Sequence, residues 1–222
     1  MVAFSKNFIY LKKDPITLFK IDNFFDQDFY RDVKKLFLKG DSDELRSSVG
    51  FSRLGKKTIH PSKKNFNDEN EKKIITKLNE ILYSKDFFYF MIKNIFFTNL
   101  ANQTDILRKM KYLRFPIIDN KEKSLLDFLF SKISVDYHFS YIKNKGSMWP
   151  HVDAQRKYAS LMLYFPDEDE KEIEYGTTFW ESRTLNYSNK HIIEPDKVND
   201  FKNENKVLYK FPFVSNCMYG FL

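Results

Sequence analysis

The apolar residues change their spacing partway along the chain, and this change limits the folds that the chain can adopt. In two stretches, residues 29–37 and 74–95, they recur every three or four positions, the period of a helix with one buried face. From residue 135 onward they alternate with polar residues, the period of a strand with one buried face. A helical part followed by a strand-rich part predicts an α+β fold.

Three helices are expected in the first hundred residues. Asp26 is a candidate N-cap of the first, with Phe25 and Tyr30 placed as a hydrophobic staple. The second is expected over residues 70–83, and Ser84 is a candidate N-cap of the third. The third helix carries an apolar stripe of Phe87, Phe88, Met91, Ile92 and Ile95. Such a stripe indicates core packing, so these helices are expected to cover a sheet.

Short strands are expected on both sides of these helices. The expected strands are residues 19–23, 135–142, 158–165, 177–180, 206–213 and 217–222. The polar stretches 41–69, which contains His60, and 188–200 are expected to form surface loops. No repeat or linker divides the chain, so residues 1–222 are expected to form one domain. Residues 1–100 would be its mainly helical flanking part and residues 130–222 its β-core.

Composition narrows the classes of protein. Of 222 residues, 42% are hydrophobic, enough for a sizeable core, and no apolar run approaches the ~20 residues that span a bilayer. A membrane partner is therefore not expected. With one cysteine, Cys217, no intramolecular disulfide can form, and a cytoplasmic location is expected. The net charge of +7 comes from lysines scattered among acidic residues, which makes a nucleic-acid partner unlikely.

The residue pair with the clearest chemical meaning is His151 and Asp153. On a strand, positions i and i+2 point to the same face, ~6.5 Å apart along the chain, so two side chains can converge on one ion. Imidazole and carboxylate suit Fe(II), and a second histidine would complete a facial triad. Short motifs arise by chance, and the alternative is a surface histidine bonded to a nearby carboxylate.

The residues around this pair resemble the core of the 2-oxoglutarate/Fe(II)-dependent dioxygenases, particularly the prolyl-hydroxylase-like branch. The matching positions are Tyr141, Gly146, His151, Asp153, Arg156 or Lys157, Ser160, residues 161–165, and Gly176 with Thr177 and Thr178. The resemblance covers roughly the last third of the chain, and residues 19–25 resemble the entry strand and helix of the family more loosely.

The resemblance implies a double-stranded β-helix, the jelly-roll or cupin-like core, with N-terminal flanking helices. It implies that His151 and Asp153 are iron ligands and that Tyr141 and Tyr164 contact the co-substrate. The cofactors would be Fe(II) and 2-oxoglutarate, and the reaction would be hydroxylation of a small-molecule or peptide substrate that the sequence does not identify. Four aromatic residues are candidates for the site lining or for ordinary core: Tyr137, Phe139, Trp149 and Trp180.

The third iron ligand is not evident in the sequence. His60, His138 and His191 remain, and His191 is a weak third candidate because it lies in a polar stretch. Residues 216–222 resemble the family strand that leads into the distal histidine. The sequence therefore predicts an incomplete, inactive chain that lacks the last strands of the β-core, the distal histidine and the arginine for 2-oxoglutarate.

Two other classes stay open. One is a non-catalytic binding or scaffold module of the same fold, and the other is a cupin-like protein such as a sugar isomerase. Cupins usually offer more histidines in their motifs, so the second ranks lower. Iron-dependent formation of succinate from 2-oxoglutarate separates the dioxygenase from both.

Overall fold

The fold was analysed in a computed structural model of the chain. The structure describes residues 4–39, 56–61, 68–102, 117–118, 132–133, 135–142, 148–153, 159–166, 175–183 and 192–222. Within these ranges it is a mixed α/β protein with mainly antiparallel strands, as the change of hydrophobic period predicts.

The structure contains the helices and strands that the sequence predicts, together with further short elements that the sequence does not predict. The helices are α1 (Gln27–Lys39), α3 (Glu69–Leu82), α4 (Lys85–Asn102) and α7 (Val198–Glu204), the last preceded by a 3-10 turn at Pro195–Lys197. The strands are β1 (Phe8–Lys12), β2 (Leu18–Asp22), β3 (Lys56–Ile59), β4 (Ile117–Ile118), β5 (Lys132–Ile133), β6 (Phe139–Ile142), β7 (Ser160–Leu163), β8 (Thr178–Glu181), β9 (Lys206–Lys210) and β10 (Cys217–Phe221).

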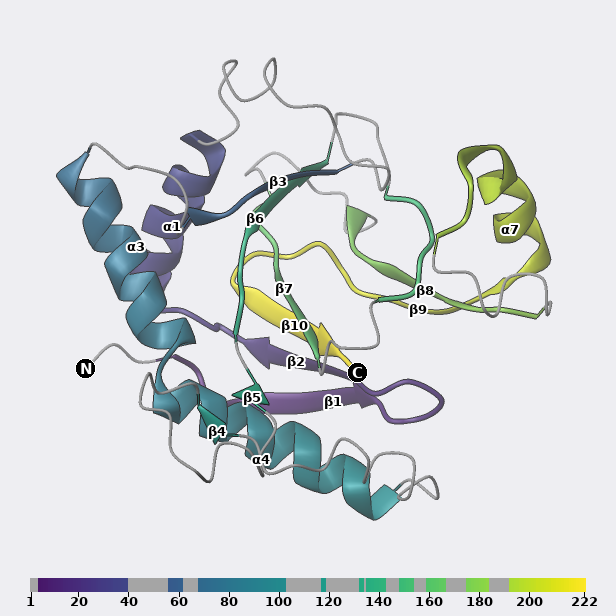
Figure 1. The fold of residues 1–222 in the computed structure, drawn as a ribbon, viewed down its shortest axis with the longest axis horizontal. Helices are drawn as coiled ribbons and strands as arrows, with labels where there is room; N and C mark the ends of the chain where they lie inside the picture. The colour runs from purple at the N-terminus through teal and green to yellow at the C-terminus, as the bar shows by residue number, and fades with distance from the viewer. Residues whose placement is uncertain are drawn as a thin grey trace.

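A four-stranded antiparallel sheet in the order β1-β2-β10-β7 lies at the centre of the molecule (Figure 1). The C-terminal strand β10 is an inner strand, because it pairs with β2 on one side and with β7 on the other. The remaining strands form two-stranded pairs, β3 with β6, β8 with β9, and the parallel pair β4 with β5. The two ends of the sequence therefore meet in one sheet.

Each face of the central sheet packs against a different layer. Phe19 and Ile21 of β2 point into the larger core cluster, which contains residues of α1, α3 and α4. Leu18 of β2 points the other way, into a second cluster with Phe179 of β8 and Tyr209 of β9. In Figure 1, α1 and α3 lie to the left of the sheet and α4 lies below it, whereas β8, β9 and α7 lie to its right. Alternation along each strand therefore gives the central sheet two faces. One is the helix-facing side, and the other, called the inner face, packs against the β8–β9 pair.

The predicted helix starts are confirmed by their caps. The Asp26 carboxylate accepts from the backbone N–H of Asp28 at 3.0 Å and of Phe29 at 3.4 Å. The Ser84 hydroxyl accepts from the N–H of Phe87 at 3.0 Å. Each cap satisfies helix N–H groups that have no partner within the helix, an effect worth ~1 kcal/mol.

Asn216 ties the last strand to the start of α1. Its side-chain oxygen accepts from the N–H of Phe25 at 2.9 Å, and its amide group donates to the carbonyl of Phe25 at 2.8 Å. Its backbone carbonyl accepts from the N–H of Phe24 at 2.9 Å. Asn216 has a φ of 50°, a left-handed conformation that asparagine tolerates better than most residues. This buried amide closes the gap between two segments 191 residues apart.

The expectation of loops over residues 41–69 and 188–200 was wrong in part. Residues 56–59 form β3, which pairs with β6, and Val198–Glu204 form α7. Of the strand expected over residues 135–142, only Phe139–Ile142 is regular strand. Strand β3 is polar and weakly patterned, so it depends on its partner more than on its own sequence.

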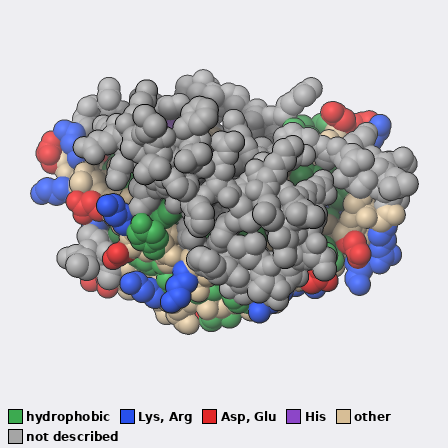
Figure 2. All heavy atoms as spheres, turned by 60° about the horizontal axis from the view of Figure 1, so that its bottom comes forward, with side chains coloured by type: hydrophobic (Ala, Val, Ile, Leu, Met, Phe, Trp, Pro, Cys, Tyr) green, Lys and Arg blue, Asp and Glu red, His purple; other side chains and the backbone are tan. Residues whose placement is uncertain are grey.

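No helix within the described ranges is long and apolar enough to cross a membrane. Charges on the described part of the face in Figure 2 alternate in sign, with acidic side chains next to basic ones. This arrangement agrees with the scatter of charges along the sequence.

Candidate metal centre

His151 and Asp153 lie on a short extended segment beside residues 192 and 193. His151 pairs with Ile192 as a single antiparallel bridge, and the N–H of Ile193 donates to the carbonyl of Pro150 at 3.0 Å. Val152, between the two, is 53% exposed, whereas the His151 and Asp153 side chains are 17% and 22% exposed. The segment thus has the alternation of a strand, which the spacing of the two residues requires.

The two side chains face one another. His151 Nε2 lies 3.6 Å from Asp153 Oδ1. Two ligands ~2.1 Å from one ion would be ~3.0 Å apart at a right angle and ~3.4 Å apart in a tetrahedral arrangement. A small side-chain rotation therefore brings both atoms within reach of one cation. Neutral imidazole and carboxylate are ligands that Fe(II) accepts, so the two residues fit this metal.

A backbone contact orients the His151 ring. Its Nδ1 lies 2.9 Å from the carbonyl oxygen of Trp149. A carbonyl can only accept, so Nδ1 carries the proton and, in the neutral ring, Nε2 presents its lone pair toward Asp153. This is the tautomer that a metal ligand needs, with the outer nitrogen held by a carbonyl.

The other two described histidines lie elsewhere. His60 and His138 face each other across the β3–β6 pair, with ring centroids 5.5 Å apart, and His60 Nδ1 is 4.0 Å from Asp136 Oδ1. Within the described ranges, no three His, Cys, Asp or Glu side chains are grouped so that they could hold one metal ion. His191 lies outside the described residues, although its neighbour Ile192 pairs with His151.

The two tyrosines predicted to contact the co-substrate lie in different clusters. Tyr141 belongs to the helix-facing core, where its ring stacks on Phe37 at 4.4 Å and its hydroxyl donates to the Phe37 carbonyl at 2.7 Å. Tyr164 packs against the cluster on the inner face, the face to which Ser160 also points. The structure does not bring the two tyrosines together. Only Tyr164 shares a sheet face with Ser160, which is hydrogen-bonded to Asp153.

Tyr164 is bonded to the turn that enters β8. Its hydroxyl donates to Thr177 Oγ1 at 2.8 Å and accepts from the Thr177 N–H at 3.1 Å. Burial raises the pKa of the Tyr164 hydroxyl, so it stays protonated and remains a donor at neutral pH. The adjacent Gly176 is needed because a Cβ there would lie 1.6 Å from the carbonyl oxygen of Phe211. The Gly-Thr segment found in the sequence therefore has a packing role.

Sequence reasoning missed the apolar cluster beside the pair. Ile193, Val198 and Phe201 form a small core of their own, against which Trp149 and Trp180 pack. The spacing of Val198 and Phe201 after Pro195 is a short helical signal that could have revealed α7. Tyr137 and Phe139 lie instead with the helix-facing core, so of the four aromatic residues only the tryptophans lie in this cluster.

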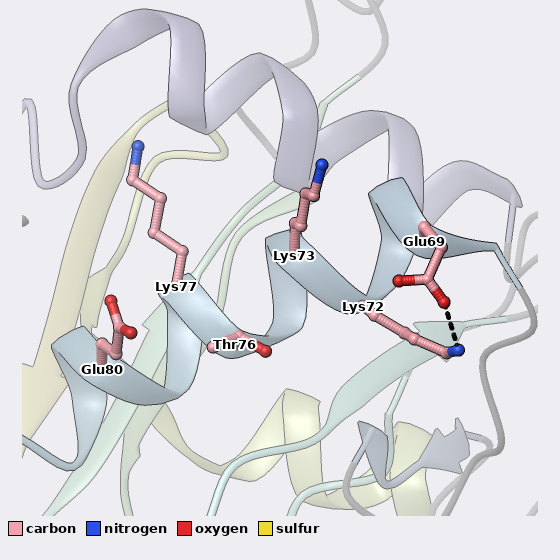
Figure 3. Close-up of a pocket in the computed structure, with 6 residues that line it drawn as sticks. All are labelled: Glu69, Lys72, Lys73, Thr76, Lys77 and Glu80. Carbon is pink, nitrogen blue, oxygen red and sulfur yellow. Dashed lines mark hydrogen bonds and ion pairs between the residues drawn. The ribbon is translucent and has the colours of Figure 1, made fainter.

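A hollow on the surface of α3 offers no comparable chemistry. Its six lining residues, Glu69, Lys72, Lys73, Thr76, Lys77 and Glu80, all come from this one helix (Figure 3). Lys72 pairs with Glu69 at 2.6 Å, and Lys77 lies over the Phe29 ring at 4.3 Å from its centroid. These contacts are those of a solvated helix face.

Comparison with known proteins found no matching family model, no matching curated protein and no matching solved structure. The centre is therefore interpreted from its own geometry.

Proposed function

We propose that this chain supplies two of the iron ligands of a 2-oxoglutarate- and Fe(II)-dependent oxygenase that hydroxylates a small molecule or a peptide side chain. The observation that carries the proposal is the approach of His151 Nε2 to Asp153 Oδ1, 3.6 Å apart, with the histidine tautomer fixed by the Trp149 carbonyl. A histidine that ligates a metal commonly donates its other ring N–H to a carbonyl, as His151 Nδ1 does to Trp149. An ordinary surface ion pair does not need this contact.

The sheet arrangement supports a jelly-roll core for this proposal. The β8–β9 pair packs across the second core cluster against the inner face of the central sheet, as in a two-layer β-sandwich. Ser160, at the start of β7, belongs to the same inner face and bonds to Asp153. In such a core the candidate ligands would lie beside the space between the two sheets.

In this proposal the residues of the chain bind and orient, and the iron with 2-oxoglutarate supplies oxidation by O₂. His151 and Asp153 would hold two of the metal positions. The third protein ligand is sought outside the described residues, among which His191 is the weak candidate that the sequence offers. Tyr164 would donate a hydrogen bond to the co-substrate only after its hydroxyl leaves Thr177 Oγ1, to which it donates in this structure. Trp149 and Trp180 would help to exclude water.

The test is a titration of the protein with Co(II) or Mn(II) under anaerobic conditions, followed by an assay for succinate with Fe(II) and 2-oxoglutarate. We expect saturable binding that is lost in His151→Ala and Asp153→Asn, with His60→Ala as the matched control. Equal affinity in the variants and the parent would refute the metal centre. The variant His191→Ala tests the third ligand in the same assay.

A non-catalytic module of the same fold is the second candidate. It is favoured by the observation that, among described residues, only two ligands converge at the centre. Metal binding without iron-dependent succinate formation, in a protein that does contain the distal histidine, would favour this second function and overturn the first.

A further inference from the structure

We infer that Ser160 is a positioning residue of the metal centre, whose hydroxyl holds the Asp153 carboxylate with one oxygen directed toward His151. This inference rests on the proposed metal centre. The Ser160 hydroxyl donates to Asp153 Oδ2, while Asp153 Oδ1 is the oxygen that faces His151 Nε2. The carboxylate is thereby held at one oxygen, and the other is turned toward the position between the two ligands.

The position of Ser160 in the sheet is otherwise apolar. Its partner on β10 is Phe221, and the partner of Phe221 on β2 is Leu18. The next residues along the chain on the same face are Met162 of β7 and Tyr164, just after the end of β7. A half-buried hydroxyl in such a row needs a hydrogen-bond acceptor to offset the loss of water. Asp153 is the acceptor that the structure provides.

His151 and Asp153 are held in the same manner from outside. The Trp149 carbonyl holds His151 Nδ1, and the Ser160 hydroxyl holds Asp153 Oδ2. In both residues the atom farther from the other ligand is hydrogen-bonded to the protein. The remaining two atoms, His151 Nε2 and Asp153 Oδ1, face each other. Such outer contacts orient metal ligands, and removing one typically weakens metal affinity about 10- to 100-fold.

A purely structural role for Ser160 predicts something different. If the bond only tied residue 153 to the start of β7, its loss would lower the stability of the metal-free protein and leave metal affinity unchanged. Threonine and valine at position 160 separate the two roles, because they share a shape that suits a strand and differ in the hydroxyl. Ser140 on β6 provides a control serine in another sheet.

The experiment measures Co(II) affinity, by competition with a chromophoric chelator, for the parent, Ser160→Ala, Ser160→Val, Ser160→Thr and Ser140→Ala. Thermal unfolding of each metal-free protein is recorded beside it. We expect affinity to fall 10- to 100-fold in Ser160→Ala and Ser160→Val and to stay within a few-fold of the parent in Ser160→Thr and Ser140→Ala.

Two results would overturn the inference, and they are distinguishable. If the parent binds Co(II) and Ser160→Val binds it equally well, Ser160 has no positioning role and the metal centre stands. If the parent binds no Co(II) at all, the proposed centre fails and the inference fails with it.

Discussion

Gly220 of β10 lies under the ring of Phe19, and an alanine there has no space. A Cβ built on Gly220 would lie 2.1 Å from Cζ, 2.4 Å from Cε2 and 2.8 Å from Cε1 of Phe19. Ordinary carbon contacts begin near ~3.5 Å, so the ring would have to move by ~1.4 Å. It cannot do so freely, because Phe19 is fully buried and stacks on Phe8 with ring centroids 4.7 Å apart.

We expect Gly220→Ala to cost about 3 kcal/mol of unfolding free energy, the upper part of the range for overpacked cores. The backbone of Gly220 is not in the left-handed region, so contact with the ring is the only source of the cost. For a chain of this length, about 3 kcal/mol corresponds to a fall in Tm of about 6–12 °C. Thermal unfolding followed by circular dichroism measures it.

A second substitution tests the physical cause. Phe19→Leu removes the three ring atoms that the new Cβ would meet, and costs stability on its own because it leaves a cavity. In the double variant the two costs should not add, and the total should fall short of their sum by about 1–2 kcal/mol. Additive costs, or a Gly220→Ala variant as stable as the parent, would refute the reasoning.

Three further predictions follow from buried contacts. Asn216→Ala should lower the free energy of unfolding by about 3 kcal/mol, measured by denaturant titration, because it leaves the buried N–H and C=O of Phe25 without their partner. Asn216→Asp should cost at least as much, because it buries a carboxylate against the carbonyl of Phe25. Tyr141→Phe should lower the free energy of unfolding by about 1 kcal/mol, because the hydrogen bond to the Phe37 carbonyl is lost, and should leave Co(II) affinity unchanged. A raised KM for 2-oxoglutarate in this variant would instead support contact between Tyr141 and the co-substrate. Burial raises the pKa of Cys217 from 9.0 to about 11. Between these two pH values the thiol loses its proton in the unfolded chain and keeps it in the folded chain. The free energy of unfolding should therefore fall by about 2 kcal/mol as the pH rises from 9 to 11. Cys217→Ala should lose that part of the alkaline decline, and an unchanged decline would contradict the assignment.

The features of this protein that depend on neighbours along the chain could be predicted from the sequence. Helix periodicity placed α1, α3 and α4, and the caps Asp26 and Ser84 marked where two of them begin. Short apolar runs bounded by turn residues located the strand cores of β2, β7 and β10. The one-residue spacing of His151 and Asp153 was enough to put both side chains on one side of an extended segment, because alternation is a local property of the backbone.

Which distant groups meet could not be predicted from the sequence and is set by the packing of the folded chain. This packing turned the Tyr141 hydroxyl toward α1, and it paired His151 with Ile192. It also brought Ser160 to Asp153, the contact on which the positioning inference rests. Strand β3 and helix α7 were missed for the same reason, since each is short and is stabilised mainly by its packing partners. Contacts across many residues depend on sheet order and on the packing of whole layers, and no local period in the sequence records either of these.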